Sequence, residues 1–188
     1  MRVLVIQDRP IDQITPALIA NGFSVVAAVG PCDALLPQAQ ASAVDSVVLD
    51  VRSPDAALLG RLTDLNQRRP CPIVLFADND DVALIRRAVR AGVTAYIVQG
   101  LHVTRLKAVM DVACARFAEQ RRLKAELDST QRSLAERKTV DRAKGILMDE
   151  RGMSESAAYN ALRKLAMDQN QRVGEAARYI ISVAEFPG

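Results

Sequence analysis

The stretch from residue 103 to residue 149 contains no proline and only one glycine, Gly145. Proline ends helices and glycine weakens them, so a segment of this composition predicts one continuous helix, beginning near His102. A helix of that length exceeds what a small globular domain can cover. We therefore expect it to leave the domain in which it begins and to separate the chain into two parts.

Leucines recur along this predicted helix at spacings of four and seven residues. Leu123, Leu127 and Leu134 form the series, Thr130 occupies the remaining position, and charged residues crowd the flanks. The pattern predicts a short coiled coil of about two heptads, with the three leucines as the dimerisation residues. A single solvated helix is the alternative. We assign residues 116–136 to this coiled-coil linker.

Lysine is confined to the second half of the chain. Residues 1–102 hold nine arginines and ten aspartates but neither lysine nor glutamate, and the first lysine is Lys107. Residues 103–188 hold sixteen Lys and Arg against twelve Asp and Glu. The two parts therefore differ in chemistry, and the second carries the positive balance.

Composition excludes several classes of protein. The chain has 188 residues, 49% of them hydrophobic and 25% charged, which is typical of a folded domain. The single histidine, His102, excludes a multi-histidine metal site and argues against a Ser-His-Asp triad. Cys32, Cys71 and Cys114 lack CxxC spacing, which favours a reducing compartment. No signal peptide and no apolar run of about 18 residues is present, so we expect a cytoplasmic protein without membrane contact. We do not expect an enzyme.

Five short apolar runs alternate with segments of helical spacing in the first hundred residues. This alternation predicts an α/β fold with a doubly wound, five-stranded parallel sheet. Asn21-Gly22 and Ala91-Gly92 stand where two of the helices should end. The apolar runs are Val3–Ile6, Val25–Val29, Val44–Leu49, Ile73–Phe76 and Ala95–Val98, and the helical segments are Ile11–Ala20, Cys32–Ala41, Asp55–Asn66 and Asp80–Ala91.

In such sheets the functional residues lie beyond the carboxyl ends of the strands. Asp8 follows the first run, Asp50 ends the third, and Ala77-Asp78 follows the fourth. Over residues 1–115 this pattern resembles the flavodoxin-like receiver domain of bacterial response regulators. The resemblance implies that Asp50 matches the phospho-accepting aspartate and that Asp8 matches one of the two acidic residues that bind Mg²⁺.

The chain departs from the receiver pattern at three positions. Gln7 replaces the second acidic residue, Ala77 replaces the Ser or Thr that donates to the phosphoryl group, and Gln99 replaces the lysine. A site with one carboxylate and one cation fewer holds Mg²⁺ and phosphate poorly, so we expect no cofactor. Weak Mg²⁺ binding at Asp8 and Asp50 is left open.

These departures favour a pseudo-receiver, which would serve as a docking and dimerisation surface, over a working phospho-switch. Arg9 directly follows Asp8, and Arg52 stands two residues after Asp50. We hypothesise that the two arginines pair with Asp8 and Asp50 in place of the missing partners.

The end of the long helix is basic on one flank and apolar on another. Val140, Ala143, Ile146 and Leu147 share an apolar stripe, which predicts packing against two further helices. A glycine within a helix costs about 1 kcal/mol relative to alanine, so Gly145 suggests the close approach of a backbone or a ligand. A basic helix is often only a solvated face, and that interpretation is the alternative to a nucleic-acid interface.

Three segments together resemble the ANTAR domain, the RNA-binding module of transcription antiterminators of the AmiR/NasT family. The resemblance covers about residues 128–185 and implies a three-helix domain, which we assign to residues 128–188. The matching segments are Arg137-Lys138-x-x-x-x-Ala143-Lys144-Gly145-Ile146-Leu147-Met148, Ser154-Glu155-x-Ala157-Ala158-Tyr159 and Leu162-Arg163-x-x-Ala166-Met167.

The resemblance also supplies candidate RNA-binding residues. Lys144 is the first, followed by Arg142, Lys138 and Arg163, with Arg137 and Lys164 as weaker candidates. Ala143 and Gly145 would give a low surface on which an RNA loop can lie. We expect Tyr159 to face the small core rather than to stack on a base.

Segments of the first domain, 95–100 and 105–117, resemble the NasT-type members of this family. That resemblance implies a protein that binds a leader RNA with two paired hairpins and lets RNA polymerase, an indirect partner, read through a terminator into nitrate or nitrite assimilation genes. It also implies control by a NasS-like nitrate-sensor protein, and two hairpins imply a homodimer at least on RNA. A phosphorylation-dependent regulator with a DNA-binding output is the first alternative, and an adaptor whose basic helix contacts only protein is the second.

Overall fold

The computed structural model describes residues 1–9, 11–31, 35–41, 43–98 and 103–185. Cys32, Gln99 and His102, on which several of the predictions above rest, lie outside the described residues. The chain forms two compact units, Met1–Arg121 and Arg122–Gly188, which we describe separately.

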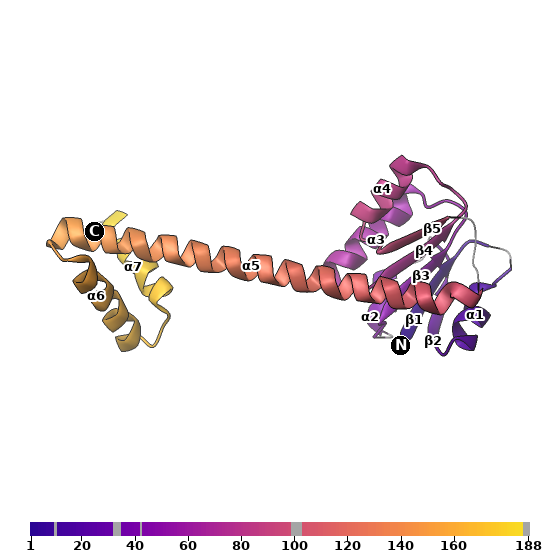
Figure 1. Ribbon diagram of the computed structural model, residues 1–188, viewed down its shortest axis with the longest axis horizontal. Helices are drawn as coiled ribbons and strands as arrows, with labels where there is room; N and C mark the ends of the chain where they lie inside the picture. Colours follow the sequence, from indigo (N-terminus) through magenta and orange to yellow (C-terminus); the bar gives the residue numbers. More distant parts are fainter. Residues whose placement is uncertain (10, 32–34, 42, 99–102, 186–188) are drawn as a thin grey trace. The chain divides into compact units, whose positions relative to one another are not determined.

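The first unit contains the predicted five-stranded parallel sheet (Figure 1). The strand order is β2-β1-β3-β4-β5, and every neighbouring pair is parallel. The strands are β1 (Arg2–Gln7), β2 (Ser24–Val29), β3 (Ser46–Asp50), β4 (Ile73–Ala77) and β5 (Ala95–Val98), and the helices between them are α1 (Ile14–Ala20), α2 (Leu35–Ala41), α3 (Ala56–Arg68) and α4 (Val82–Arg90). The predicted fold class is therefore confirmed, with element ends that differ by up to three residues where residues are described.

Alternate residues of β1, β3 and β4 enter two separate cores. Leu4 and Ile6 of β1 pack toward α2, α3 and α4, whereas Val3 and Val5 pack toward α1 and the start of α5. Both faces of the sheet are thus covered, which explains why the strands read as continuous apolar runs. The carboxyl ends of β1, β3 and β4 remain together at one edge.

Two helices of this unit end as the sequence predicts. Gly22 (φ 82°) and Gly92 (φ 103°) adopt the left-handed conformation directly after α1 and α4. Their backbone N–H groups donate to Ile19 O and Val89 O, which satisfies carbonyls that would otherwise lack partners.

The long helix α5 runs from Leu106 to Arg151, preceded by a short 3-10 turn at Val103–Arg105. Its beginning packs on the sheet through Leu106, Met110 and Ala113, and its end belongs to the second unit. The continuous helix that the proline-free stretch predicts is present. No helix among the described residues is both long enough and apolar enough to cross a membrane.

The second unit adds α6 (Glu155–Asp168) and α7 (Val173–Glu185) to the end of α5. Ser154 caps α6, because its hydroxyl accepts from Ala157 N. Asn170 lies in the connection between α6 and α7. It adopts φ 50°, and Asn170 N and Gln171 N donate to Met167 O and Ala166 O, so Asn170 ends α6 and α7 begins three residues later.

Candidate functional site

Three aspartates gather at the carboxyl edge of the sheet. Asp50 is the last residue of β3 and only 3% exposed, while Asp8 and Asp78 directly follow β1 and β4. Backbone hydrogen bonds tie the three strand ends together: Asp8 N donates to Asp50 O (3.3 Å) and Asp78 N donates to Arg52 O (3.0 Å). The acidic edge expected from the sequence is therefore assembled.

The guanidinium of Arg9 lies between two of these carboxylates. Arg9 Nε donates to Asp50 Oδ1 (2.6 Å), and Nη1 and Nη2 donate to the two oxygens of Asp78 (3.2 and 2.8 Å). These contacts lower the pKa of Asp78, chiefly through the Arg9 hydrogen bonds, and raise the already high pKa of Arg9 further. The bidentate geometry is the strong form of an arginine–carboxylate contact.

The hypothesis that two arginines pair with Asp8 and Asp50 agrees with this geometry. Arg9 pairs with Asp50, whereas Arg52 pairs with Asp8 through its backbone N–H (3.1 Å) and more distantly through Nε (3.8 Å). The sequence analysis missed the contact between Arg9 and Asp78. The sequence places Asp50 at the end of β3 and Asp78 directly after β4, but it does not show that Arg9 reaches both.

The residues at this edge do not fit a bound Mg²⁺. Arg9 already occupies Asp50 Oδ1 and both oxygens of Asp78, so a cation would have to displace a guanidinium. Among the described residues, no group of three or more His, Cys, Asp or Glu is arranged to hold a metal ion. Ala77, fully buried at the end of β4, offers no side-chain donor to a phosphoryl group.

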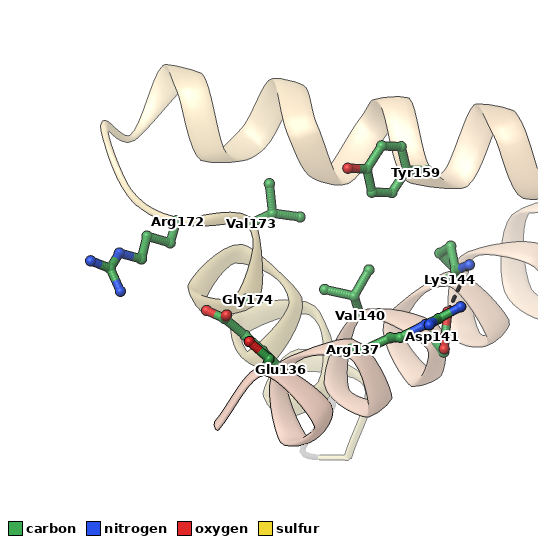
Figure 2. Close-up of a pocket in the computed structure, with 10 residues that line it drawn as sticks. Glu136, Arg137, Val140, Asp141, Lys144, Tyr159, Arg172, Val173 and Gly174 are labelled. Carbon is green, nitrogen blue, oxygen red and sulfur yellow. Dashed lines mark ion pairs between the residues drawn. The ribbon is translucent and has the colours of Figure 1, made fainter. Parts of the chain in front are cut away.

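A groove of about 510 Å³ opens between the three helices of the second unit (Figure 2). Val140 of α5 and Tyr159 of α6 lie on opposite sides of it. The groove thus combines an aromatic ring, apolar side chains and both signs of charge. Its lining residues are Ser133, Glu136, Arg137, Val140, Asp141, Lys144, Tyr159, Arg172, Val173 and Gly174.

Lys144, the first RNA-binding candidate, lines this groove but is not an open cation. Its ammonium contacts Asp141 Oδ1 and Glu155 Oε1, each at 2.8 Å, and its side chain is 16% exposed. The hydrogen bonds that Lys144 donates to these two carboxylates raise the pKa of Lys144, and the bond to Asp141 lowers the pKa of Asp141.

Tyr159 was expected in the core, and this expectation is wrong. The core positions of α6 are Ala158, Leu162 and Ala166, which follow one another at intervals of four, and Tyr159 lies about 100° around the helix from Ala158. Its side chain is 45% exposed and faces the groove, so an aromatic ring is available to a ligand.

Ala143 was expected both in the apolar stripe of α5 and at the RNA surface; the first expectation is confirmed and the second is wrong. Ala143 is fully buried in the core with Leu147, Ala158, Leu162 and Ala177. Gly145 is only partly buried, and a Cβ atom added there would meet nothing within 4 Å. Nothing described therefore lies close to the position of a side chain at residue 145, so a packed backbone does not explain the glycine. That a ligand approaches Gly145 stays a prediction.

The other cationic candidates are exposed and lie around the groove or beyond it. Arg137 lines it, and Figure 2 shows Arg172, which sequence reasoning missed, pointing outward from the connection between α6 and α7. A cation in a short interhelical connection has no periodic pattern to reveal it. Four further candidates, Lys138, Arg142, Arg163 and Lys164, are exposed but do not line the groove.

The leucine series of α5 is exposed in the single chain. Leu123, Leu127 and Leu134 are 53%, 56% and 54% exposed and lie on one face of the helix. Apolar side chains exposed at heptad spacing are typical of a coiled-coil seam. Dimerisation through them stays a prediction.

Comparison with known proteins gives the same division of the chain. Residues 128–181 match the family model of the ANTAR domain. The transcriptional regulatory protein PdtaR of Mycobacterium tuberculosis is 28% identical over 188 residues, covering 99% of this chain and 92% of PdtaR. The nitrate regulatory protein of Klebsiella oxytoca is 46% identical over 65 residues, but these are 35% of this chain and only 16% of that protein.

Solved receiver domains share the fold of the chain. The signal receiver domain of the putative response regulator NarL from Mycobacterium tuberculosis superposes with a TM-score of 0.52 at 24% identity, over 60% of this chain and 94% of that one. The chemotaxis protein CheY4 of Vibrio cholerae superposes with a TM-score of 0.51 at 20% identity, over 59% of this chain and 97% of CheY4. Identities this low concern the fold alone.

Proposed function

We infer that this chain, a response regulator with an ANTAR domain at its C-terminal end, binds RNA and acts as a transcription antiterminator. It would bind a leader RNA with two hairpins and prevent termination ahead of nitrate or nitrite assimilation genes. The observation that carries this proposal is the groove, in which the exposed ring of Tyr159 lies beside the cations Lys144 and Arg137.

The chemistry of the groove suits an unpaired RNA loop. Sequence-specific RNA recognition takes bases that are splayed out of a loop and stacks them on aromatic rings, while Lys and Arg contact the neighbouring phosphates. Tyr159 can supply the stacking surface, and Arg137, Lys144 and Arg172 surround it. Gly145 lies on α5, as Arg137 and Lys144 do, and it has no side chain that would obstruct an RNA loop next to Lys144.

A DNA-binding output fits this surface less well. Direct reading of duplex DNA requires a helix whose side chains project into a major groove about 12 Å wide. Here the aromatic and cationic residues line a recess between helices instead, and a recess accommodates a single base better than a duplex. The alternative of a phosphorylation-dependent DNA-binding regulator draws its support from Asp50, which keeps its place at the end of β3.

The direct test compares RNA with DNA. Gel shifts would use the full chain with its leader RNA, with a mixed-sequence RNA and with duplex promoter DNA. We expect a preference for the leader RNA that Lys144→Ala lowers and that Lys107→Ala, an exposed lysine of the first unit, leaves unchanged. Preferential binding of DNA, or an unchanged RNA affinity in Lys144→Ala, would contradict the proposal.

Control of this activity would come from a partner protein rather than from phosphorylation. Arg9 neutralises Asp50 and Asp78 from within the chain, so the acidic edge has no need of Mg²⁺ or phosphate. We propose that a NasS-like nitrate sensor holds the regulator inactive and releases it when nitrate or nitrite binds. Co-purification of the two proteins with and without nitrate tests this, and a complex that ignores nitrate would contradict it.

A further inference from the structure

The ammonium of Lys144 is shared between two carboxylates from different helices. Asp141 lies one turn earlier on α5, and Glu155 is the first residue of α6; each carboxylate is 2.8 Å from Lys144 Nζ. The carboxylates are far more open to solvent than the lysine they hold: their side chains are 56% and 71% exposed, against 16% for Lys144. The arrangement therefore turns a cation inward and leaves negative charge at the surface.

The charge of the groove is nearly balanced as a result. Its lining includes the cations Arg137, Lys144 and Arg172 and the anions Glu136 and Asp141, and Glu155 stands beside them. A site built only to attract polyanions would carry an excess of Lys and Arg, because phosphate contacts supply most non-specific affinity. A phosphate that approaches Lys144 instead meets two carboxylates of its own sign.

We propose that Asp141 and Glu155 compete with RNA phosphate for Lys144 and thereby suppress binding of RNA without the correct loop. This inference rests on the proposed function, since it concerns the selectivity of the same site. The ammonium leaves one carboxylate only when other contacts, such as a base on Tyr159, hold the RNA in place. Non-cognate polyanions lack those contacts and gain little from Lys144.

The competition has a signature in the salt dependence of binding. Neutralising one RNA phosphate releases counterions and adds about 0.7–0.9 to the slope of log K against log salt. When Lys144 leaves Glu155, the freed carboxylate takes up a counterion of its own, which offsets part of that release. Removing the carboxylate charge should therefore make the slope steeper, an effect that a purely structural role of Glu155 would not produce.

The experiment uses the full chain, with Glu155→Gln as the variant and Glu150→Gln as the control. Glu150 is an exposed residue near the end of α5, and its substitution changes the net charge equally. Fluorescence anisotropy would measure binding to polyuridylate and to an RNA hairpin taken from the leader. We expect Glu155→Gln to bind polyuridylate about threefold to tenfold more tightly, to gain less on the hairpin, and to show the steeper slope.

Three further measurements separate the outcomes. In a Lys144→Ala background, Glu155→Gln should have no more effect than Glu150→Gln, because the competition needs the lysine. Thermal unfolding shows whether Glu155→Gln loosens α6, and Asp141→Asn tests the other carboxylate within α5. If Glu155→Gln and Glu150→Gln behave alike while Lys144→Ala still weakens hairpin binding, the competition is refuted and the proposed function stands. If the wild-type chain binds neither RNA, the proposed function itself fails.

Discussion

Arg9 Nε donates to Asp50 Oδ1 at 2.6 Å, so the aspartate at the phospho-acceptor position has a cation from its own chain as partner. Asp50 is nearly buried, and a buried carboxylate requires such a partner. The resemblance to receiver domains implies that this part of the edge would bind Mg²⁺ and phosphate. In this chain Arg9, which directly follows Asp8 in the sequence, contacts Asp50 and Asp78 instead.

The wild-type chain should not accumulate an aspartyl phosphate. With a small phosphodonor and Mg²⁺, the guanidinium blocks Asp50 and Ala77 offers no donor to the phosphoryl group. Mass spectrometry of the intact protein would measure the result. A stable phosphoryl group on Asp50 would overturn the pseudo-receiver interpretation and favour the phosphorylation-dependent alternative.

Arg9→Ala should uncover the acidic edge. Asp50 would lose its partner, which costs about 1–3 kcal/mol of unfolding free energy for a buried acceptor, and Asp8, Asp50 and Asp78 would together attract a divalent cation. We expect Mg²⁺ to raise the Tm of this variant but not of the wild type. Arg52→Ala is the control, because Arg52 is mostly exposed and its Nε is 3.8 Å from Asp8. Equal responses of the two variants would contradict the role of Arg9.

The exposed ring of Tyr159 should carry much of the RNA affinity. Stacking of a base on an aromatic ring is worth about 1–3 kcal/mol, so Tyr159→Leu should weaken binding of the leader RNA about tenfold or more, whereas Tyr159→Phe should keep most of it. Tyr179→Leu is the matched control, because Tyr179 is 52% exposed on α7 and does not line the groove. Anisotropy titrations would measure the RNA affinities of the three variants. An equal loss of affinity in Tyr159→Leu and Tyr179→Leu would contradict specific stacking of a base on Tyr159.

Sequence patterns predicted the fold because each pattern is local. An apolar run between two helical segments requires a covered strand, and the glycines after α1 and α4 occur where the backbone turns left-handed. The contact of Arg9 with Asp78 joins residues 69 positions apart, and no local pattern encodes it. Such contacts depend on which strands become neighbours, and only the assembled sheet reveals that.

The candidate site was predicted in part. Lys144 and Arg137 do line the groove, whereas Ala143 lies in the core, as the apolar stripe predicts, and Tyr159 lies at the groove rather than in the core. Helical periodicity says which residues share a face, not which face meets the neighbouring helix. On α6 the small Ala158 packs inside, and its neighbour Tyr159 therefore points into the groove. The rotation of α6 about its own axis decides which of its residues meet α5, and the packing of the core determines that rotation.

Burial of Cys71 predicts a loss of stability at alkaline pH. Burial raises the pKa of the Cys71 thiol to about 11, whereas an unfolded chain ionises its cysteines near pH 8.5. Between these values only the unfolded state releases the proton, so the free energy of unfolding should fall by up to about 1.4 kcal/mol per pH unit and level off above pH 11. Denaturant unfolding from pH 7 to 10.5 would show a flatter profile for Cys71→Ala. If the free energy of unfolding falls equally with pH in Cys71→Ala and in the wild type, burial of Cys71 is not the cause.

The exposed leucines of α5 should hold two chains together when RNA is bound. Leu127 is 56% exposed and lies on the same helix face as Leu123 and Leu134, so Leu127→Glu places a charge in the middle of the predicted seam. Ala125→Glu introduces the same charge on the opposite face of the helix, about 160–200° away. Sedimentation of the chain with a two-hairpin leader RNA should give two chains per RNA for the wild type and for Ala125→Glu, and one or none for Leu127→Glu. Because each ANTAR domain would keep its own groove, Leu127→Glu should still bind a single hairpin with nearly wild-type affinity. Loss of single-hairpin binding would mean that the leucines support the fold of the domain rather than its pairing.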